Sequence, residues 1–502
     1  MSSAMKTLFL NPPSFENFDG GAGARWPATR ETASYWYPAW LTYPAGTLAD
    51  SRLLDAPPHK VTPTQTVEIA RGYDFVVLFT STVGFHSDLR LARRMKEAKP
   101  EIKIAFVGPP VQVQPTESLR AGPDIDFIVR GEFDQAVVEY AQGKPLGEIA
   151  GVSYRKDGQV VHNPARPPLG TAELDRLPFA TEVYKRDLVM EKYNLPFLLY
   201  PYVSFYTSRG CPAQCSFCLW PQTLSGHAWR VRSTDNVVEE VRLALKLFPQ
   251  AKELFFDDDT FNIRPDRVLE LCRKFKPLGF RWSCNARVHG DYETLKAMAD
   301  AGVRLLIVGF ESGDPQILKN INKGTTVEMA RAFVKNCKKV GIAIHGDFII
   351  GLPGETGESI KRTIEFAKEL DTETIQVSVA HAFPGTDLYD YALRNKFLAT
   401  EAAADAGGFQ LPHLEYPDLG REEMMAAMNH FYDAYYFRPR VVWRIVRHAL
   451  WDAGERRRLY REAVGFFRVR AERRKYAGSG SGKAGMGATS VVDSGSGPTA
   501  PP

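Results

Sequence analysis

The stretch "TSRGCPAQCSFCLWPQ", residues 207–222, places cysteines at positions 211, 215 and 218. The chain has six cysteines in 502 residues, and the other three, Cys272, Cys284 and Cys337, are single and far apart. Most structural zinc sites and iron–sulfur clusters use four protein ligands. A triplet with no fourth cysteine nearby therefore predicts either a distant fourth ligand or a metal site with one open position.

The composition predicts a globular intracellular protein of two or three domains. Hydrophobic residues make up 44% of the chain and charged residues 24%, which is the balance of ordinary folded proteins. Sparse, scattered cysteines argue against a secreted disulfide framework. The first apolar run is too short for a signal peptide, and no stretch reaches the roughly 18 apolar residues of a spanning helix. We therefore expect a cytoplasmic protein. The net charge of only +4 gives no indication of a nucleic-acid partner, and we expect none.

Residues 1–150 predict an α/β domain with a Rossmann-like parallel sheet. The apolar runs "KTLFLNPP", "YDFVVLFTSTVGF", "IKIAFVGPP" and "IDFIVRGE" alternate with helical stretches such as "SDLRLARRMKEAKP". This alternation is typical of a doubly wound sheet. Ligands of such sheets bind at the carboxyl ends of the strands, although a purely structural domain is the alternative. The predicted strand ends are Asn11, Ser81, Gly108 and Arg130.

A second alternating series predicts a partial (β/α)6 barrel over residues 201–400. It follows a connector, 151–200, in which "GVSYRKDGQVVHNP" predicts a hairpin with Asp157 and Gly158 at its turn. The expected strands are "YVSFYTS", "ELFFDDD", "FRWSCNA", "RLLIVGF", "AIHGDFII" and "TIQVSVAH". Two of the intervening helices end in glycine, as helix C-termini commonly do. We expect a helical C-terminal segment over 401–475 and a disordered Gly/Ser/Pro-rich tail over 476–502.

The cysteine triplet follows the first strand of this barrel, on a loop opened by Gly210. Its C-x3-C-x2-C spacing differs from the paired cysteines of zinc ribbons and from the ferredoxin run, so a zinc site is the weaker alternative. Three thiolates on a [4Fe–4S] cluster leave one iron open. That iron can bind the amino and carboxylate groups of S-adenosylmethionine (SAM), and an electron from the cluster then cleaves SAM to a 5′-deoxyadenosyl radical.

"CPAQCSFC" resembles the signature of the radical SAM superfamily. The resemblance implies that Cys211, Cys215 and Cys218 hold the cluster. It also implies SAM contacts at the strand ends within "FFDDDTF", "SCNARV", "GFESGD" and "IIGLPGET". No catalytic residue is assigned. The implied SAM contacts are Phe217, Asp258, Asp259, Arg287, Glu311, Ser312 and Ile350.

The N-terminal domain is similar to the cobalamin-binding domain that precedes this core in one large branch of the superfamily. "YPAG" (43–46), "FVGPP" and "IVRGEFD" match that branch, which implies bound cobalamin. The sequence has no D-x-H-x-x-G motif, and the branch's usual histidine after Gly-Pro is Pro110 here. No histidine is therefore evident to ligate cobalt from below, which leaves the chemical role of cobalamin open.

The closest resemblance is to radical enzymes of hopanoid biosynthesis, through "NPPSFENFDGGAGARWPATRE" and the text around the cysteines. It implies a hopanoid lipid substrate, glucosaminyl bacteriohopanetetrol, whose glucosamine ring is contracted to a cyclitol ether. The alternative is a cobalamin-dependent radical methyltransferase, since the domain order is shared. A sensor without turnover is disfavoured, because it would not need a full set of nucleoside contacts. The electron donor is expected to be a flavodoxin or ferredoxin.

Two further stretches bear on the substrate. The segment 220–233, "WPQTLSGHAWRVRS", is rich in Trp, His and Arg, and it could face an amino sugar or be ordinary packing. His345, Asp347, Gln376 and His381 could point into the barrel, but no role is assigned to them. The segment 437–451, "FRPRVVWRIVRHALW", suits a membrane surface, so we expect peripheral contact at the inner membrane. Packing of this helix on the barrel, with its arginines in solvent, is the alternative.

Overall fold

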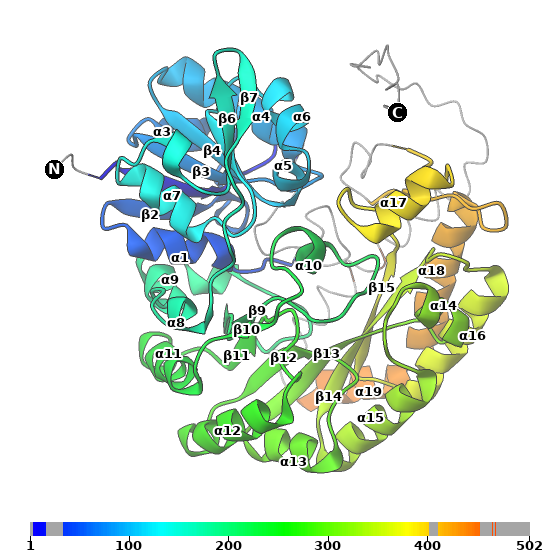
Figure 1. Cartoon of the computed structure of the whole chain (residues 1–502). Coiled ribbons are helices and arrows are strands. Elements are labelled where there is room, and N and C mark those ends of the chain that lie inside the picture. The colour runs from blue at the N-terminus through cyan, green and yellow to red at the C-terminus, as the bar shows by residue number, and fades with distance from the viewer. Residues whose placement is uncertain (1–3, 17–33, 401–409, 452–463, 465–466, 468–502) are drawn as a thin grey trace.

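A computed structural model describes residues 4–16, 34–400, 410–451, 464 and 467 (Figure 1). Two parallel sheets organise it, and the predicted α/β fold class is confirmed. The segment 17–31, which carried part of the hopanoid resemblance, lies outside the described residues. The same holds for the predicted disordered tail and for parts of the C-terminal segment.

The N-terminal sheet has seven strands in the order β2-β1-β3-β4-β5-β6-β7. The first five are parallel, and the predicted hairpin, β6 and β7, extends the sheet by antiparallel pairing. Asp157 and Gly158 both have positive φ, as a tight hairpin turn requires. The strand order reverses between β1 and β3, which creates a crevice at their carboxyl ends. The bounds are β1 Thr7–Asn11, β2 Ser51–Asp55, β3 Phe75–Phe79, β4 Lys103–Val107, β5 Phe127–Val129, β6 Val152–Lys156 and β7 Gln159–His162.

Helices cover both faces of this sheet, because its strands are apolar on both sides. Phe9, Val77 and their counterparts on one face pack against α1 and α7. Leu8 and Val76 on the other face pack against α3 and α4. The strands are accordingly continuous apolar runs rather than alternating ones. The helices of this half are α1 Ala39–Thr47, α2 Ala56–His59, α3 Pro63–Ala70, α4 Phe85–Ala98, α5 Pro109–Val113, α6 Pro115–Ala121, α7 Asp134–Ala141, α8 Thr171–Leu174 and α9 Ala180–Asp187.

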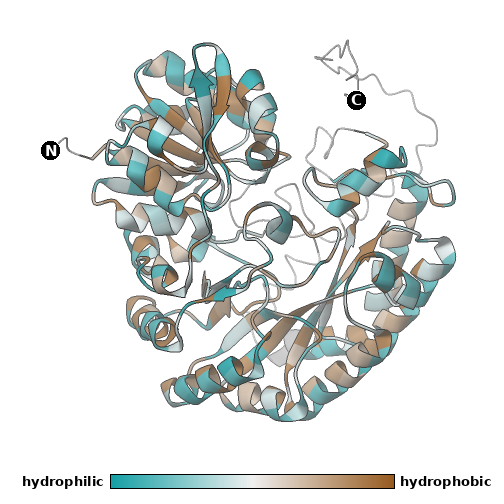
Figure 2. Cartoon of the chain, in the orientation of Figure 1, coloured by the Kyte–Doolittle hydropathy of each residue, from teal (hydrophilic) through white to brown (hydrophobic). Residues whose placement is uncertain are grey.

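The second sheet has six parallel strands in chain order, β8-β11-β12-β13-β14-β15, and it is open rather than closed. Its helices lie along the outer side of a curved half-barrel (Figure 1). Brown strands and mixed teal and brown helices show the amphipathic helix faces that this packing needs (Figure 2). The strand bounds are β8 Tyr202–Phe205, β11 Glu253–Phe256, β12 Trp282–Ala286, β13 Val303–Glu311, β14 Ala343–Ile350 and β15 Thr374–Val379. The helices are α11 Thr234–Leu247, α12 Pro265–Phe275, α13 Tyr292–Asp300, α14 Pro315–Asn320, α15 Val327–Val340 and α16 Gly357–Leu370.

The free edge of the half-barrel, β15, is covered by α18 (Arg421–Tyr436). The Tyr432 hydroxyl donates to the Val377 carbonyl and accepts from its amide, and Tyr436 does the same at Ile375. These bonds satisfy backbone groups that an edge strand would otherwise leave unpaired. The chain also forms α17 (Asp387–Arg394) and then α19 (Pro439–Trp451), which lies at the amino ends of the barrel strands (Figure 1).

Candidate active site

The three clustered cysteines lie on a loop bracketed by a two-stranded ribbon, β9 (Ser208–Arg209) and β10 (Arg230–Val231). Gly210 begins the loop with a φ of +85°, and a Cβ there would lie 2.3 Å from the Ala228 carbonyl oxygen. Glycine is therefore required for the ribbon to close beneath the loop. The Cys218 amide donates to the Cys215 carbonyl at 3.1 Å, and α10 (Leu219–Thr223) begins at once.

Contacts to backbone carbonyls hold the loop beside a cavity. Gln222 donates through Nε2 to the carbonyls of Cys215 and Cys218, at 3.2 and 2.9 Å. His227 Nδ1 lies 3.2 Å from the Cys211 carbonyl. All three cysteines line one cavity of about 1660 Å³, which occupies the lumen of the half-barrel. Burial raises the pKa of the Cys211 thiol, so a bound cation is what would hold it as a thiolate.

The other cysteines lie elsewhere, as expected. Cys272, Cys284 and Cys337 are buried in the hydrophobic core, and none lines the cavity. Burial raises the pKa of Cys272 and of Cys337 to about 12, as for inert core thiols. The cavity thus offers three thiols and no fourth, a donor set that fits a cluster with one open iron.

Among the described residues, no three His, Cys, Asp or Glu side chains are grouped so as to hold a single metal ion. A cubane cluster takes each thiolate on a different iron, so its ligands surround a face rather than a point.

Four of the predicted SAM contacts, Phe217, Asp259, Arg287 and Glu311, line the same cavity as the cysteines. Arg287 places Nη1 3.8 Å from Cys215 Sγ, and it also donates to the Lys323 carbonyl. The guanidinium therefore lies against the cluster loop as well as the predicted SAM site.

Glu311 sits at a bulge at the end of β13 with a φ of +65°. Lys323 Nζ lies 2.6 Å from its Oε1, and both side chains are only 8% exposed. Burial alone would lower the pKa of Lys323, but the nearby Glu311 carboxylate outweighs this and the net shift is upward. Gly309 makes room for the pair, because a Cβ there would meet Glu311 Oε1 at 2.2 Å. Sequence reasoning missed Lys323, which lies in a loop with no recognisable pattern.

The remaining three predicted contacts, Asp258, Ser312 and Ile350, are buried behind the cavity wall and do not line it. Ser312 shares a 3.0 Å hydrogen bond with Thr363 of α16. Their assignment as SAM contacts stays a prediction, and the side-chain contacts of Asp258 and Ser312 point to a supporting role.

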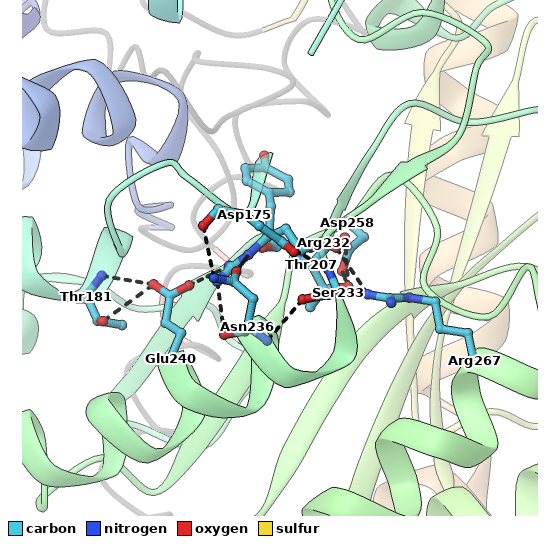
Figure 3. Close-up of polar contacts among 10 residues, drawn as sticks. Asp175, Thr181, Thr207, Arg232, Ser233, Asn236, Glu240, Asp258 and Arg267 are labelled. Carbon is cyan, nitrogen blue, oxygen red and sulfur yellow. Dashed lines mark hydrogen bonds and ion pairs between the residues drawn. The ribbon is translucent and has the colours of Figure 1, made fainter. Parts of the chain in front are cut away.

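Asp258 belongs to a polar network under the cysteine ribbon (Figure 3). It accepts from the Thr207 amide at 2.9 Å and from Ser208 Oγ at 2.6 Å. Desolvation raises the pKa of Asp258 to about 6. Arg267 donates to the Thr207 carbonyl in the same network. These contacts fix the strand that leads into the cluster loop.

Two arginines of the segment 220–233 make ion pairs inside the fold. Trp220 lines the cavity. Arg230 pairs with Glu132 at 2.8 Å and Arg232 with Glu240 at 2.5 Å, so both guanidinium groups are used inside the fold. Of the two interpretations of this segment, packing therefore applies to its arginines.

A buried arginine joins the cluster loop to the N-terminal domain. Arg209, two residues before Cys211, makes paired hydrogen bonds of 2.8 and 2.9 Å to Asp134 at the start of α7. Its guanidinium also lies 4.6 Å from the ring of Trp40 and 5.0 Å from that of Tyr43. Both partners of the ion pair are at most 3% exposed.

The carboxyl-end edge of the N-terminal sheet adjoins the cluster loop. Helix α5, which follows β4, packs against α10, which follows Cys218. Gly108 ends β4 with a φ of +118°, and a Cβ there would lie 2.2 Å from the Thr80 carbonyl oxygen at the end of β3. Glycine is therefore required where β4 ends, because any side chain there would collide with the backbone at the end of β3. No side-chain ligand comes from Pro110, so this edge fits cobalamin held without a lower histidine there.

Family comparisons agree with this arrangement. Residues 205–367 match the radical SAM superfamily, and residues 25–141 match the B12-binding domain.

An uncharacterized methyltransferase of Pyrococcus horikoshii is 30% identical over 87% of this chain and 94% of its own length. Cytidylyl-2-hydroxyethylphosphonate methyltransferase of Streptomyces wedmorensis is 29% identical over 62% of this chain and 66% of its own. An anaerobic magnesium-protoporphyrin IX monomethyl ester cyclase of Rubrivivax gelatinosus is 28% identical over 77% and 69%.

Solved structures share the fold. The radical SAM methyltransferase TsrM of Kitasatospora setae, with cobalamin and a [4Fe–4S] cluster, matches with a TM-score of 0.67 at 16% identity. The match covers 94% of this chain and 99% of that one. The cobalamin-dependent radical enzyme OxsB matches with a TM-score of 0.66 at 16% identity, over 93% of this chain and 72% of that one. The hopanoid-specific resemblance finds no support among these relatives.

Proposed function

Because this chain belongs to the radical SAM superfamily and carries a B12-binding domain, we propose that it is a cobalamin-dependent methyltransferase acting on an unactivated carbon. It is a radical SAM enzyme whose cofactors are a [4Fe–4S] cluster, SAM and cobalamin. Methyl transfer is supported by the names of the relatives, two of which are methyltransferases. Methyl transfer, the alternative hypothesis from the sequence, therefore replaces ring contraction as the proposed reaction.

The observation that carries the proposal is the junction of the two domains at the cluster loop. The contact of α5 with α10 and the Arg209–Asp134 pair set the cobalamin edge beside the cysteines. When bound, the cluster with SAM supplies a carbon-centred radical and cobalamin supplies a transferable methyl group. A substrate in the lumen would then meet both from one side.

The chain's own side chains would prepare this site in three ways. The Arg287 guanidinium stabilises negative charge on the Cys215 sulfur. The Glu311–Lys323 pair presents a fixed carboxylate at the rim of the lumen, where the SAM ammonium is expected. The strands of the half-barrel line the cavity and would shield a bound radical on that side.

Product analysis tests the proposal. The protein would be reconstituted anaerobically with cluster and cobalamin, reduced, and given SAM with a deuterated methyl group and glucosaminyl bacteriohopanetetrol. We expect 5′-deoxyadenosine, S-adenosylhomocysteine and a product heavier by one labelled methyl group. A product of unchanged mass, with no S-adenosylhomocysteine, would contradict methyl transfer and favour ring contraction. A flavodoxin or a ferredoxin, compared as reductants, would test the expected electron donor.

A hopanoid or similar amphiphilic substrate remains the second candidate, and the lumen gives it a specific basis. Toward the amino ends of the strands, the cavity is lined by apolar side chains that include Phe197, Phe280, Ile375 and Val446. The ion pairs Arg304–Glu253 and Arg444–Glu373 also line this part. A rigid apolar ligand of several rings could bury its surface from water against these apolar side chains. The substrate test above includes this class, and failure of the hopanoid alone would leave the methyltransferase proposal open to other apolar substrates.

Peripheral membrane contact is proposed on α19 in a revised form. Arg444 donates to the carbonyls of Thr372 and Glu373, so it holds the barrel rather than facing lipid. The exposed part of the helix carries apolar side chains beside Arg440 and Arg447, with Trp443 63% exposed and Val446 41% exposed. No described helix has the length and apolarity that a membrane span demands.

We expect co-sedimentation with anionic phosphatidylglycerol vesicles that weakens when Trp443 and Val446 are both changed to Ser. Exposed Arg440 and Arg447 would add a salt-dependent term of about 1 kcal/mol each near an anionic surface. If the wild-type protein and the double variant bind the vesicles equally, with or without salt, the proposed membrane contact is wrong.

A further inference from the structure

The lumen contains a group of polar side chains in the middle of β14 and β15 that the predicted cofactor contacts do not include. His345 and Asp347 of β14 both line the cavity, as do Thr374 and Gln376 of β15. The two strands pair so that His345 lies beside Thr374 and Asp347 beside Gln376. Residues two apart on a strand point to the same face, so these four side chains form a belt on the inner wall.

The belt lies next to the predicted SAM site, on the side toward the amino ends of the strands. In the neighbouring strand, Gly309 is the partner of Asp347, and Glu311 is the partner of the next residue, Phe348. Asp347 is three residues from the carboxyl end of β14, or about 10 Å at the usual rise per residue. A substrate atom beside Asp347 would thus lie just below the cofactors, and Gly309 presents no side chain there.

His345 and Asp347 can each make a further hydrogen bond. His345 Nδ1 lies 2.6 Å from the Thr374 hydroxyl, whereas its Nε2 has no hydrogen-bond partner although the residue is only 5% exposed. Asp347 Oδ1 is 3.4 Å from Nε2, which is longer than an ordinary hydrogen bond. Its side chain is 33% exposed to the cavity. A buried unsatisfied ring nitrogen in a wet cavity wall indicates a bound partner.

The chemistry of this pair favours a hydroxyl group over other partners. If the Thr374 hydroxyl donates to Nδ1, Nε2 carries the ring proton and donates into the lumen. Asp347, when ionised, can only accept. A hydroxyl donates to one and accepts from the other, whereas an ammonium can only donate and an ether can only accept. The His345 ring is held in place by Phe197, whose ring centroid lies 4.3 Å away.

We propose that Asp347 and His345 bind a hydroxyl group of the substrate and so position the carbon that carries it beneath the cofactors. The inference rests on the proposed function only in placing the substrate in this lumen. Gln376, beside Asp347, extends the belt for a second polar substituent. The apolar side chains below the belt, among them Phe197, Phe280 and Ile375, suit an apolar remainder of the molecule, so the substrate class is an amphiphile hydroxylated near its reacting carbon.

Binding of two matched probes tests this inference without turnover. The reconstituted holoenzyme would be titrated with n-octanol and with n-octyl methyl ether, which have the same chain but differ in the donor. A hydrogen bond to a charged group corresponds to a preference for the alcohol of about tenfold or more. Asp347→Leu should reduce that preference, because only the alcohol can donate to the carboxylate. His345→Phe should lower the affinity for both probes, because both can accept from Nε2, and the affinity for SAM should stay unchanged in both variants. Glu358→Gln, on the exposed face of α16, is the control.

Equal affinity of the wild-type holoenzyme for alcohol and ether would overturn the inference. So would an alcohol preference that persists in Asp347→Leu, or affinities for both probes that are unchanged in His345→Phe. The His345→Phe variant keeps an aromatic ring against Phe197, so it remains informative if Asp347→Leu folds poorly. Because no methyl transfer is needed, this result is separate from the product analysis: either proposal can fail while the other stands.

Discussion

The buried pair Glu311–Lys323 allows the sharpest test of how the cofactor rim is built. Both side chains are 8% exposed and their charged atoms are 2.6 Å apart. Changing Lys323 to Met removes one partner and leaves a carboxylate in a poorly hydrated site. Such a loss costs about 3–5 kcal/mol of unfolding free energy, because the remaining charge is uncompensated. Changing Glu311 to Gln strands the Lys323 ammonium in the same way.

The double variant should cost much less than the two single changes added together. With both charges gone, no buried ion remains, so we expect a coupling of about 2 kcal/mol or more. Urea denaturation of the anaerobic holoenzyme measures it. Isothermal titration with SAM adds a second readout. If Glu311 meets the SAM ammonium, Glu311→Gln should weaken SAM binding by about 1.5–3 kcal/mol, or roughly ten- to a hundredfold.

An exposed pair in the same barrel provides the control. Arg331 and Glu369 make two hydrogen bonds of 2.7 and 2.9 Å, but both side chains are about half exposed. The corresponding cycle should give a coupling below about 1 kcal/mol, because water screens the charges. A coupling for Glu311 and Lys323 as small as this control would refute the reasoning. Unchanged SAM affinity in Glu311→Gln would place that residue outside the cofactor site.

Three further predictions address the cluster, the network beneath it and the domain junction. Cys218→Ala should abolish the cluster absorbance and all 5′-deoxyadenosine formation, whereas Cys284→Ala should keep both; loss in the latter would reveal a fourth thiolate. The folded state holds the Asp258 proton more tightly than the unfolded chain does, because desolvation raises the pKa from 3.8 to about 6. That stabilisation is fully present below about pH 4 and is lost as the pH rises to about 6, a change of about 3 kcal/mol; wild type and Asp258→Asn should therefore diverge in urea denaturation between pH 4 and 6, and parallel curves would count against it. Arg209→Met should cost about 3–5 kcal/mol by stranding Asp134 and should lower the cobalamin retained on gel filtration; full retention at unchanged stability would argue against a structural junction.

The sheet architecture was predictable because every core strand is an apolar run that ends in a polar or turn-forming residue. Two N-terminal elements were missed. Helix α1 is buried over most of its length and contains Pro44 and Gly46, so it has neither helical periodicity nor helix-forming composition. Strand β2, "SRLLD", is only five residues long and has three buried positions, too few to distinguish it from a loop.

Site residues could be predicted where they form a motif of fixed local spacing. They could not be predicted where their role depends on side-chain orientation or on a partner far away in the sequence. The cysteine triplet is local, so its sequence was sufficient. Asp258 and Asp259 follow the end of β11, where no strand periodicity fixes their directions, so the sequence could not tell that Asp259 reaches the cavity while Asp258 bonds to Thr207 and Ser208. Lys323 and Arg209 act through partners 12 and 75 residues away, and no local pattern records such pairs.

The Arg209–Asp134 contact limits how this architecture can be divided. The barrel contributes the guanidinium and the N-terminal domain contributes its carboxylate and the Trp40 and Tyr43 rings. A barrel expressed alone would carry a cation whose whole surroundings had been removed, two residues from its first cysteine. Grafting another protein's N-terminal domain onto this barrel would leave the same gap unless the graft supplied an acidic residue and flanking aromatics. The smallest portable module is therefore the N-terminal domain together with the ribbon that carries Arg209.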